Sequence, residues 1–450
     1  MTFAAISTAI GESGIGIVRM SGDSSFEITR RIFKGSIPDD YNRKMLYGKI
    51  IDGNEEIDEV LVCFMEGPKT YTTEDMVEIF SHGGIVAVRR VFETVLKYGA
   101  RIAEPGEFTK TAFLGGRIDL SQAEAVQDLI SAKTDKSFKA SLSQLEGKLS
   151  AEIKKISDII LEMLANIEAT IDYPEEDLQA MNINELIERL NIAINMLETL
   201  ISSETVGKIL RDGITTVILG KPNVGKSSLM NAILGENRSI VTDIPGTTRD
   251  TIEELISIDG IPVKLVDTAG IRETKDEVEK IGVDRAKGII NEADLLIGMF
   301  DITKNFDKED KEILSLLQEK KSIALLNKID LKTDYDSNIM KEFEDIPIIK
   351  TSMKEEIGLD ELSKNIKEMF FSGKLELDQS LIITNLRHKD LLNKAYNELL
   401  NVKNDFENNI PVDFLQVDLR AAWSYLAEIT GDAVSEDIIN KIFSDFCLGK

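Results

Sequence analysis

A glycine-rich octapeptide of the form G-x-x-x-x-G-K-S, from Gly220 to Ser227, constrains the fold of this chain more than any other feature. It directly follows an apolar run at residues 216–219, and a phosphate-binding loop requires this strand-to-helix context. The glycines let the backbone curl so that successive N–H groups point at phosphate oxygens. We expect Lys226 to reach the β- and γ-phosphates and the Ser227 hydroxyl to bind Mg²⁺. The loop therefore predicts a nucleoside triphosphate site in an α/β domain.

Two further motifs of a nucleotide hydrolase follow the octapeptide. Asp267 begins the tetrapeptide Asp-Thr-Ala-Gly after the apolar run 263–266, which predicts a carboxylate at a strand end near the magnesium. The segment 246–250, Gly-Thr-Thr-Arg-Asp, lies between this motif and the loop, where a switch segment belongs. Its Thr248 is expected to close over the γ-phosphate and Mg²⁺.

Two motifs at later strand ends indicate guanine as the base. Asn327 to Asp330, Asn-Lys-Ile-Asp, follows the apolar run 323–326. A carboxylate at Asp330 can accept hydrogen bonds from N1–H and the N2 amine of guanine, and adenine offers neither donor. Ser352-Met353-Lys354 resembles the fifth GTPase motif, usually Ser-Ala-Lys. Met353 departs from that pattern, but a backbone N–H still serves the guanine O6.

Together the five motifs predict GTP and GDP as ligands. Alternatively, they are turn residues of an ordinary α/β domain, which five motifs in the right order disfavour. The nucleotide-binding residues predicted from the motifs are Asn223, Val224, Gly225, Lys226, Ser227, Ser228, Thr247, Thr248, Asp267, Thr268, Ala269, Gly270, Asn327, Lys328, Asp330 and Ser352.

The water-positioning glutamine of many GTPases is missing. Its place after the Asp-x-x-Gly motif is taken by Ile271, which cannot orient water. No arginine finger is identifiable either, so another group must place the nucleophile. Glu279, in the acidic stretch 276–279, is a candidate. The alternative is a solvated helix face, which such charge runs usually form.

Composition limits the class of protein. The chain has 450 residues, enough for two or three domains, and 79 acidic against 53 basic residues give a net charge of −26. Such a surface repels nucleic acid unless a local basic patch or a partner protein intervenes. The two cysteines, Cys63 and Cys447, make no disulfide framework, which favours a reducing cytoplasm. No signal peptide and no uncharged membrane-spanning run is apparent, so no membrane association is expected.

The hydrophobic pattern divides the chain into α/β and helical parts. Residues 1–116 read as an α+β domain with strands near 16–20, 46–51, 60–65 and 77–80 and a helix over 85–98. Ser121 to Glu124 reads as a capping box, and an apolar stripe from Phe138 to Ile167 predicts one long helix. Helical patterning continues over 183–210 and returns over 381–446. We therefore predict one helical domain made of two segments, 117–212 and 374–450, with a Ras-like P-loop GTPase domain inserted at 213–373.

Two other segments carry charged or reactive side chains. Residues 104–109 and 113–117 form a Gly/Pro-punctuated, charged loop that also suits an interdomain linker. The chain ends Cys447-Leu-Gly-Lys450. A terminal cysteine is more often inert than catalytic, although a free end can deliver a thiol and an ammonium into a neighbouring pocket.

The whole chain resembles the tRNA-modification GTPase family called MnmE or TrmE. The terminal Cys-x-Gly-Lys together with an inserted GTPase is highly specific to that family. The matching segments are residues 14–22, 105–109, 119–125, 246–250, 276–282 and 446–450.

The resemblance implies a homodimer that modifies the tRNA wobble uridine. With the flavin-dependent partner MnmG (GidA), in a heterotetramer, the family installs an aminomethyl-type group, such as carboxymethylaminomethyl, at uridine C5. A tetrahydrofolate derivative, in the 5-formyl or 5,10-methylene form, donates the one-carbon unit to this chemistry. Positions matching folate contacts are Arg19, Glu78, Arg117 and Lys450, where Arg117 replaces a lysine of some members. Cys447 is the matching catalytic cysteine.

The resemblance also addresses the missing glutamine. It implies that K⁺ replaces the arginine finger and that Glu279 orients the water indirectly. The matching potassium ligands are Asn223, Thr242, Ile244 and Thr247, and Thr242 thereby joins the nucleotide-binding residues.

Two other classes stay open at this point. A ribosome-assembly GTPase would be an RNA-binding switch without modification chemistry, but such proteins usually attach a basic RNA-binding module, and none is visible here. A regulatory GTPase would bind partners through its outer domains, which leaves the terminal Cys-x-Gly-Lys without an evident role.

Overall fold

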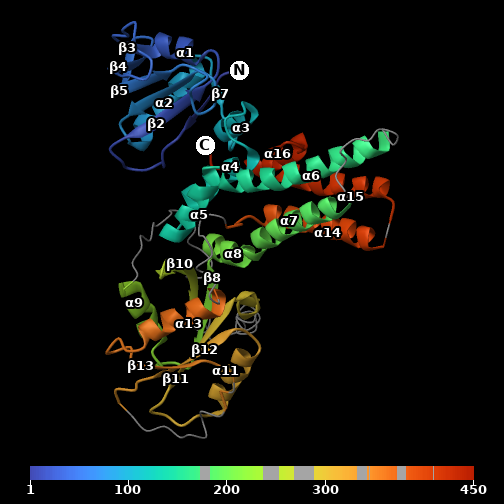
Figure 1. The fold of residues 1–450 in the computed structure, drawn as a ribbon. Helices are drawn as coiled ribbons and strands as arrows, with labels where there is room; N and C mark the ends of the chain where they lie inside the picture. Colours follow the sequence, from blue (N-terminus) through green and yellow to red (C-terminus); the bar gives the residue numbers. More distant parts are fainter. Residues whose placement is uncertain are drawn as a thin grey trace. The chain divides into compact units, whose positions relative to one another are not determined.

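A computed structural model describes residues 1–172, 183–236, 253–267, 288–331, 342–343, 345–371, 382–408 and 410–449. The chain splits into two compact units (Figure 1). The first holds residues 1–130, 142–197 and 391–450, and the second holds residues 131–141 and 198–390. The domain boundaries at 116, 212 and 373 stay predictions.

The first unit begins with a seven-stranded sheet in the order β3-β4-β5-β6-β2-β1-β7. Neighbouring strands are antiparallel except β1 and β7, which run parallel. The elements are β1 (Phe3–Ile6), β2 (Gly16–Ser21), α1 (Ser25–Ile32), β3 (Phe33–Gly35), β4 (Met45–Asp52), β5 (Glu55–Met65), β6 (Met76–Ser81), α2 (Ile85–Lys97) and β7 (Arg101–Ile102).

Helices α1 and α2 cover one face of this sheet. Ile28 and Ile32 of α1 and Val91 of α2 join a buried cluster with alternate strand residues such as Val18 and Val62. This alternation is the period of a strand with one buried face. The predicted strands and the predicted helix of the α+β domain are thereby confirmed.

Most of the described residues over 107–212 and 386–444 are helical, and those at 131–141, 198–212 and 386–390 belong to the second unit. The helices are α3 (Glu107–Leu114), α4 (Leu120–Ser131), α5 (Asp135–Leu145), α6 (Lys148–Asp172), α7 (Ile183–Ser202), α8 (Glu204–Asp212), α14 (Leu386–Glu407), η3 (Val412–Phe414), α15 (Leu415–Thr430) and α16 (Glu436–Ser444). Helix α6 packs against α15, which follows it by more than two hundred residues. The predicted helical domain built from two chain segments is therefore confirmed.

Three local predictions are wrong. The stripe from Phe138 to Ile167 lies on two helices, because Gly147 has a φ of +84° and ends the continuous pattern between α5 and α6. The capping box is formed by Asp119 and Gln122, whose side chains each accept from the other's backbone N–H at 2.9 and 3.0 Å. The segment read as a loop contains α3, which starts directly after Pro105-Gly106.

The second unit contains a six-stranded sheet in the order β13-β12-β11-β8-β10-β9. All neighbours are parallel except β9, which pairs antiparallel with β10. The elements are β8 (Ile214–Gly220), α9 (Lys226–Glu236), β9 (Glu253–Ile258), β10 (Ile261–Asp267), β11 (Leu295–Asp301), α11 (Lys308–Gln318), β12 (Ser322–Asn327), β13 (Ile348–Thr351) and α13 (Leu359–Phe371).

Helices cover both faces of this sheet, as expected for a mostly parallel sheet. Leu229 of α9 and Ile366 of α13 join the buried cluster on one face, and Leu317 of α11 joins the cluster on the other. Strands β11 and β12 are buried along their whole length. The α/β fold predicted for this segment is confirmed, and the carboxyl ends of its parallel strands meet at one edge.

Candidate nucleotide-binding site

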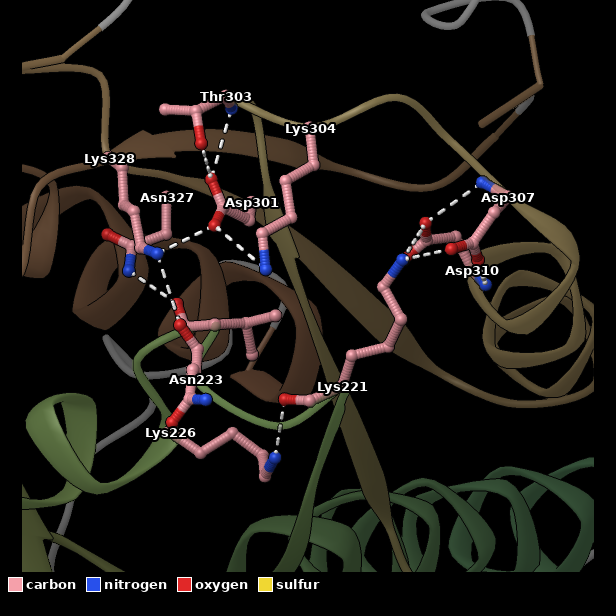
Figure 2. Close-up of polar contacts among 11 residues, drawn as sticks. Lys221, Asn223, Lys226, Asp301, Thr303, Lys304, Asp307, Asp310, Asn327 and Lys328 are labelled. Atoms are coloured by element: carbon pink, nitrogen blue, oxygen red, sulfur yellow. Dashed lines mark hydrogen bonds and ion pairs between the residues drawn. The ribbon is translucent and has the colours of Figure 1, made fainter.

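The octapeptide joins β8 to α9, as the motif requires. Asn223 and Gly225 have φ values of 63° and 112°, so the loop turns through left-handed conformations. A Cβ on Gly225 would lie 2.4 Å from the side-chain nitrogen of Asn327, so no larger residue fits there. Lys226 is the first residue of α9. Its Nζ donates to the carbonyl of Gly220 at 2.8 Å and to that of Lys221 at 2.9 Å, and Figure 2 shows the second of these bonds. The ammonium therefore lies against the backbone of the loop, next to the N-terminus of α9, where a helix favours a bound anion.

Asn327, at the end of β12, ties the loop to the neighbouring strand. The residue is 3 % exposed, and its Nδ2 donates to the carbonyl of Val224 at 2.7 Å. Its Oδ1 accepts from the backbone N–H of Met353 at 3.2 Å. One buried amide thus joins the first motif to the fourth across 103 residues, and the fourth to the fifth across 26 residues.

Asp330 and Ser352 meet at the same edge. The Ser352 hydroxyl is buried and donates to Oδ1 of the exposed Asp330 at 2.8 Å. This bond orients the carboxylate that the sequence analysis assigns to guanine. Met353 lies in the turn after β13 and is buried, so the departure from alanine is accommodated by packing.

Lys328 extends from the same turn back to the phosphate loop. Its Nζ donates to the carbonyl of Asn223 at 3.1 Å and to Oδ2 of Asp301 at 2.6 Å (Figure 2). Burial disfavours the charged form of Asp301, but the bonds from Lys328 and Thr303 outweigh it and hold the pKa of this carboxyl below 3.8. The Asp301 carboxylate is therefore ionised at neutral pH.

A second lysine anchors the outer side of the loop. Lys221 is turned away from Lys226, and its Nζ contacts Oδ2 of Asp310 at 2.6 Å and Oδ2 of Asp307 at 2.8 Å. Burial opposes the charge of Lys221, yet the hydrogen bonds to both carboxylates raise its pKa above 10.5. Asp307 also caps α11 in a reciprocal capping box with Asp310. Sequence analysis missed Lys221, Asp301, Asp307 and Asp310.

Several predicted site residues lie outside the described residues. They are Thr242, Ile244, Thr247, Thr248, Thr268, Ala269, Gly270, Glu279 and Lys450. Asp267 ends β10 opposite Ile218 of β8, one strand from the loop. Ser227 and Ser228 are exposed in the first turn of α9.

The chain end lies against the N-terminal sheet, within the first unit. Arg19 of β2 donates from Nε to Glu78 of β6 at 2.8 Å and from Nη1 to the carbonyl of Gly449 at 3.3 Å. The Ser7 hydroxyl donates to the same carbonyl at 3.2 Å. Cys447 is exposed and its carbonyl accepts from the N–H of Gly106 at 3.4 Å. Three predicted residues, Arg19, Glu78 and Cys447, are thereby brought to one region.

Aromatic rings complete this region. The Arg19 guanidinium lies 5.6 Å from the centre of the Phe108 ring and 6.0 Å from that of Tyr71. Arg117 lies 4.6 Å from the same tyrosine ring and donates to the Tyr71 carbonyl at 3.0 Å. Two cations around an aromatic ring form a surface that attracts flat, anionic molecules. Sequence analysis missed Tyr71 and Phe108, because only the tertiary fold places them beside the arginines.

Comparison with known proteins agrees with this architecture. The family described as "GTP-binding protein TrmE N-terminus" matches residues 2–117, and "MnmE helical domain" matches residues 120–447. The chain belongs to the MnmE (TrmE) family. It is 52 % identical over 449 residues to the tRNA modification GTPase MnmE of Finegoldia magna, covering 99 % of both chains. It is 49 % identical over 454 residues to that of Clostridioides difficile, covering 100 % of this chain and 99 % of the relative.

Membership of this family makes the chain a GTP hydrolase involved in tRNA modification. Among solved structures, the G domain of T. maritima FeoB is 29 % identical and covers 34 % of this chain and 97 % of its own, with a TM-score of 0.27. Among the described helices, none combines the length and apolar character needed to cross a membrane.

Proposed function

We propose that this GTPase, acting with a flavin-dependent MnmG-type partner, installs a carboxymethylaminomethyl-type group at C5 of the tRNA wobble uridine. The docking of the chain end beside Arg19 and Glu78 is the observation that carries the proposal. A pure nucleotide switch has no evident use for a cysteine-containing chain end whose backbone docks beside a cationic, aromatic surface. In this proposal the protein works as a cytoplasmic homodimer and forms a heterotetramer with its partner.

In the GTPase domain, the residues of the five motifs bind and orient GTP. The backbone N–H groups of the loop and the Lys226 ammonium neutralise phosphate charge, and Ser227, Thr248 and Asp267 suit Mg²⁺. Asp330 reads the guanine edge while the buried Ser352 hydroxyl holds it in place.

Potassium is the proposed replacement for an arginine finger. Asn223 is exposed, and within the described residues its side-chain amide takes part in no hydrogen bond, so its oxygen is available to a cation. Thr242, Ile244 and Thr247 are the other proposed ligands, and Glu279 is proposed to orient the attacking water. Bound K⁺ would neutralise charge that develops in the transition state.

The cationic surface around Arg19 fits a tetrahydrofolate derivative, which would supply the one-carbon unit. The Arg19 and Arg117 guanidiniums suit its carboxylates, and the Tyr71 and Phe108 rings suit a flat pterin. Glu78 would hold Arg19 in orientation through its 2.8 Å contact. Lys450 is proposed as a further contact, and Cys447 as the group that acts on the carbon or the uridine.

The test replaces Cys447 by serine. Serine has nearly the same size but is a far poorer nucleophile at neutral pH, so packing changes little. Mass spectrometry of tRNA nucleosides from cells that carry only Cys447→Ser should show unmodified wobble uridine, while the purified variant hydrolyses GTP normally. Leu448→Ala, in the same exposed tail, is the matched control and should leave modification intact.

Full modification in Cys447→Ser cells would remove the thiol from the mechanism. If cells without any copy of this protein still carry fully modified wobble uridine, the ribosome-assembly or regulatory alternative is favoured. Loss of both activities in Cys447→Ser would indicate that the tail is needed for folding.

A further inference from the structure

Asp301 is a buried carboxylate at the nucleotide site that belongs to none of the five motifs. It is the last residue of β11, and its side chain is 1 % exposed. It accepts hydrogen bonds from the backbone N–H of Thr303 at 3.0 Å and from the Thr303 hydroxyl at 2.6 Å. The Lys328 ammonium donates to its other oxygen at 2.6 Å. Every oxygen of the carboxylate is therefore engaged.

Lys328 is the point at which two loops meet. Its Nζ bridges Asp301 and the carbonyl of Asn223, so a chain of contacts runs from β11 through the base-recognition turn to the phosphate loop (Figure 2). Both Lys328 and Asn223 have positive φ, at 71° and 63°, which is uncommon for non-glycine residues and less favourable for lysine than for asparagine. The ion pair with Asp301 can stabilise Lys328 in this conformation.

The charge of Asp301 matters more than its shape. A lysine side chain has four rotatable bonds, and an ammonium that contacts only a carbonyl is weakly fixed. A buried carboxylate fixes it through a charge-assisted hydrogen bond, which is about twice as strong as a neutral one. Lys304 also lies near Asp301, but its ammonium is 4.0 Å away and its side chain is 56 % exposed, so it contributes little.

We propose that Asp301 is a positioning residue for guanine-nucleotide binding, which holds the Lys328 ammonium against the Asn223 carbonyl and so fixes the base-recognition turn relative to the phosphate loop. The proposal rests on the nucleotide-site assignment in the proposed function. It predicts that Asp301 acts on nucleotide affinity only through Lys328.

The test is a double-mutant cycle on the full-length protein, with affinity measured by titration of fluorescent N-methylanthraniloyl-GDP. Asp301→Asn keeps the size of the side chain and removes its charge. It should weaken binding by about 10- to 100-fold, and raise the KM for GTP with kcat within about threefold. The matched control, Lys304→Gln, removes the exposed neighbouring charge and should leave affinity unchanged.

The cycle is completed in a Lys328→Met background. There, the additional effect of Asp301→Asn should fall to less than about threefold, because the group it positions is already gone. An equal loss in both backgrounds would overturn the proposal, as would unchanged affinity in Asp301→Asn itself. If the natural protein itself binds no guanine nucleotide, the nucleotide-site assignment fails. If the natural protein binds GDP and Lys328→Met binds it equally tightly, only the positioning proposal fails, so the two failures are distinguishable.

A milder variant keeps the test decisive if Asp301→Asn does not fold. Thr303→Ala removes one hydroxyl donor to the same carboxylate and leaves the ion pair with Lys328. It should weaken GDP binding by about two- to fivefold, and this loss should vanish in the Lys328→Met background. Unchanged affinity in Thr303→Ala, or a loss that persists without Lys328, would contradict the positioning role.

Discussion

Replacing Asp330 by asparagine is the sharpest test of base recognition. In the folded protein Asp330 is exposed and accepts one hydrogen bond from the buried Ser352 hydroxyl at 2.8 Å. An asparagine oxygen can accept the same bond, so we expect the free energy of unfolding to change by less than about 0.5 kcal/mol. Any loss of nucleotide affinity then comes from the base contact and not from the fold.

The size of that loss follows from the hydrogen bonds involved. A hydrogen bond to a charged group contributes roughly 1.5–3 kcal/mol, and Asp330→Asn removes the charge and turns one acceptor into a donor facing guanine. Because the site is open to water, we expect a loss of about 2–4 kcal/mol, which is roughly 30- to 1000-fold in the dissociation constant. The 2-oxo group of xanthine accepts from the new amide, so xanthosine triphosphate should bind better than GTP.

Isothermal titration with both nucleotides measures these affinities. Ser352→Ala is the matched control: it keeps the charge of Asp330 and removes the 2.8 Å bond that orients it, together with a longer 3.4 Å bond from the Glu355 N–H. It should cost about 1 kcal/mol of nucleotide-binding free energy and give no preference for xanthosine triphosphate. Unchanged GTP affinity in Asp330→Asn would refute the assignment of this carboxylate to the base.

Three further outcomes are expected. GTP turnover should be slow in sodium chloride and stimulated by potassium chloride, and equal turnover in both salts would count against the role of K⁺. Asn223→Ala and Glu279→Ala should each lower kcat at nearly constant KM. Gly225→Ala, at φ 112° and with its Cβ 2.4 Å from the amide of the asparagine that ends β12, should destabilise the fold by about 2–4 kcal/mol, and a urea-unfolding change under 1 kcal/mol would contradict this. The hydrogen bond and charge of Asp58 raise the pKa of His82 above 6.5. The contact between His82 and Asp58 therefore stabilises the folded protein fully below about pH 6.5, and this stabilisation is lost as the pH rises through the pKa of His82 in the folded protein. Proton NMR titration should show this pKa returning to its ordinary value in Asp58→Asn.

Local signals in the sequence were sufficient for much of the fold. Hydrophobic period and glycine position predict three parts of the fold. They are the strand before the phosphate loop, the strands of the N-terminal sheet that bury one face, and the helical segment near the end of the chain. The errors also have local causes. Gly147 lies between two stretches whose apolar residues happen to stay in phase, so the period alone could not reveal the break. At α4, Asp119 precedes Ser121 by two residues, and either can cap a helix.

The polar contacts that hold the site together were not predictable from such signals. Lys221 meets Asp307 and Asp310, which lie 86 and 89 residues further along the chain. The contact arises because β11 is the immediate neighbour of β8, so the turns that follow both strands lie at one edge of the sheet. Strand order is a tertiary property that the sequence pattern does not reveal. Lys221 occupies a variable position of the octapeptide motif, so the motif does not predict which residues it contacts.

Two motif residues, Asn223 and Lys328, have a structural role besides their predicted contacts with the ligand. Left-handed backbone at a non-glycine residue costs roughly 1–2 kcal/mol, which asparagine tolerates better than lysine. Lys328 adopts it nonetheless, because this conformation accompanies the contact of its ammonium with both Asp301 and the Asn223 carbonyl. The strain at Lys328 and Asn223 is thus offset by the contact between them. The motif residues Lys328 and Asn223 therefore also contribute contacts that stabilise the loops around the site. Substitutions at these two residues should lower both the stability of the fold and the affinity for nucleotide.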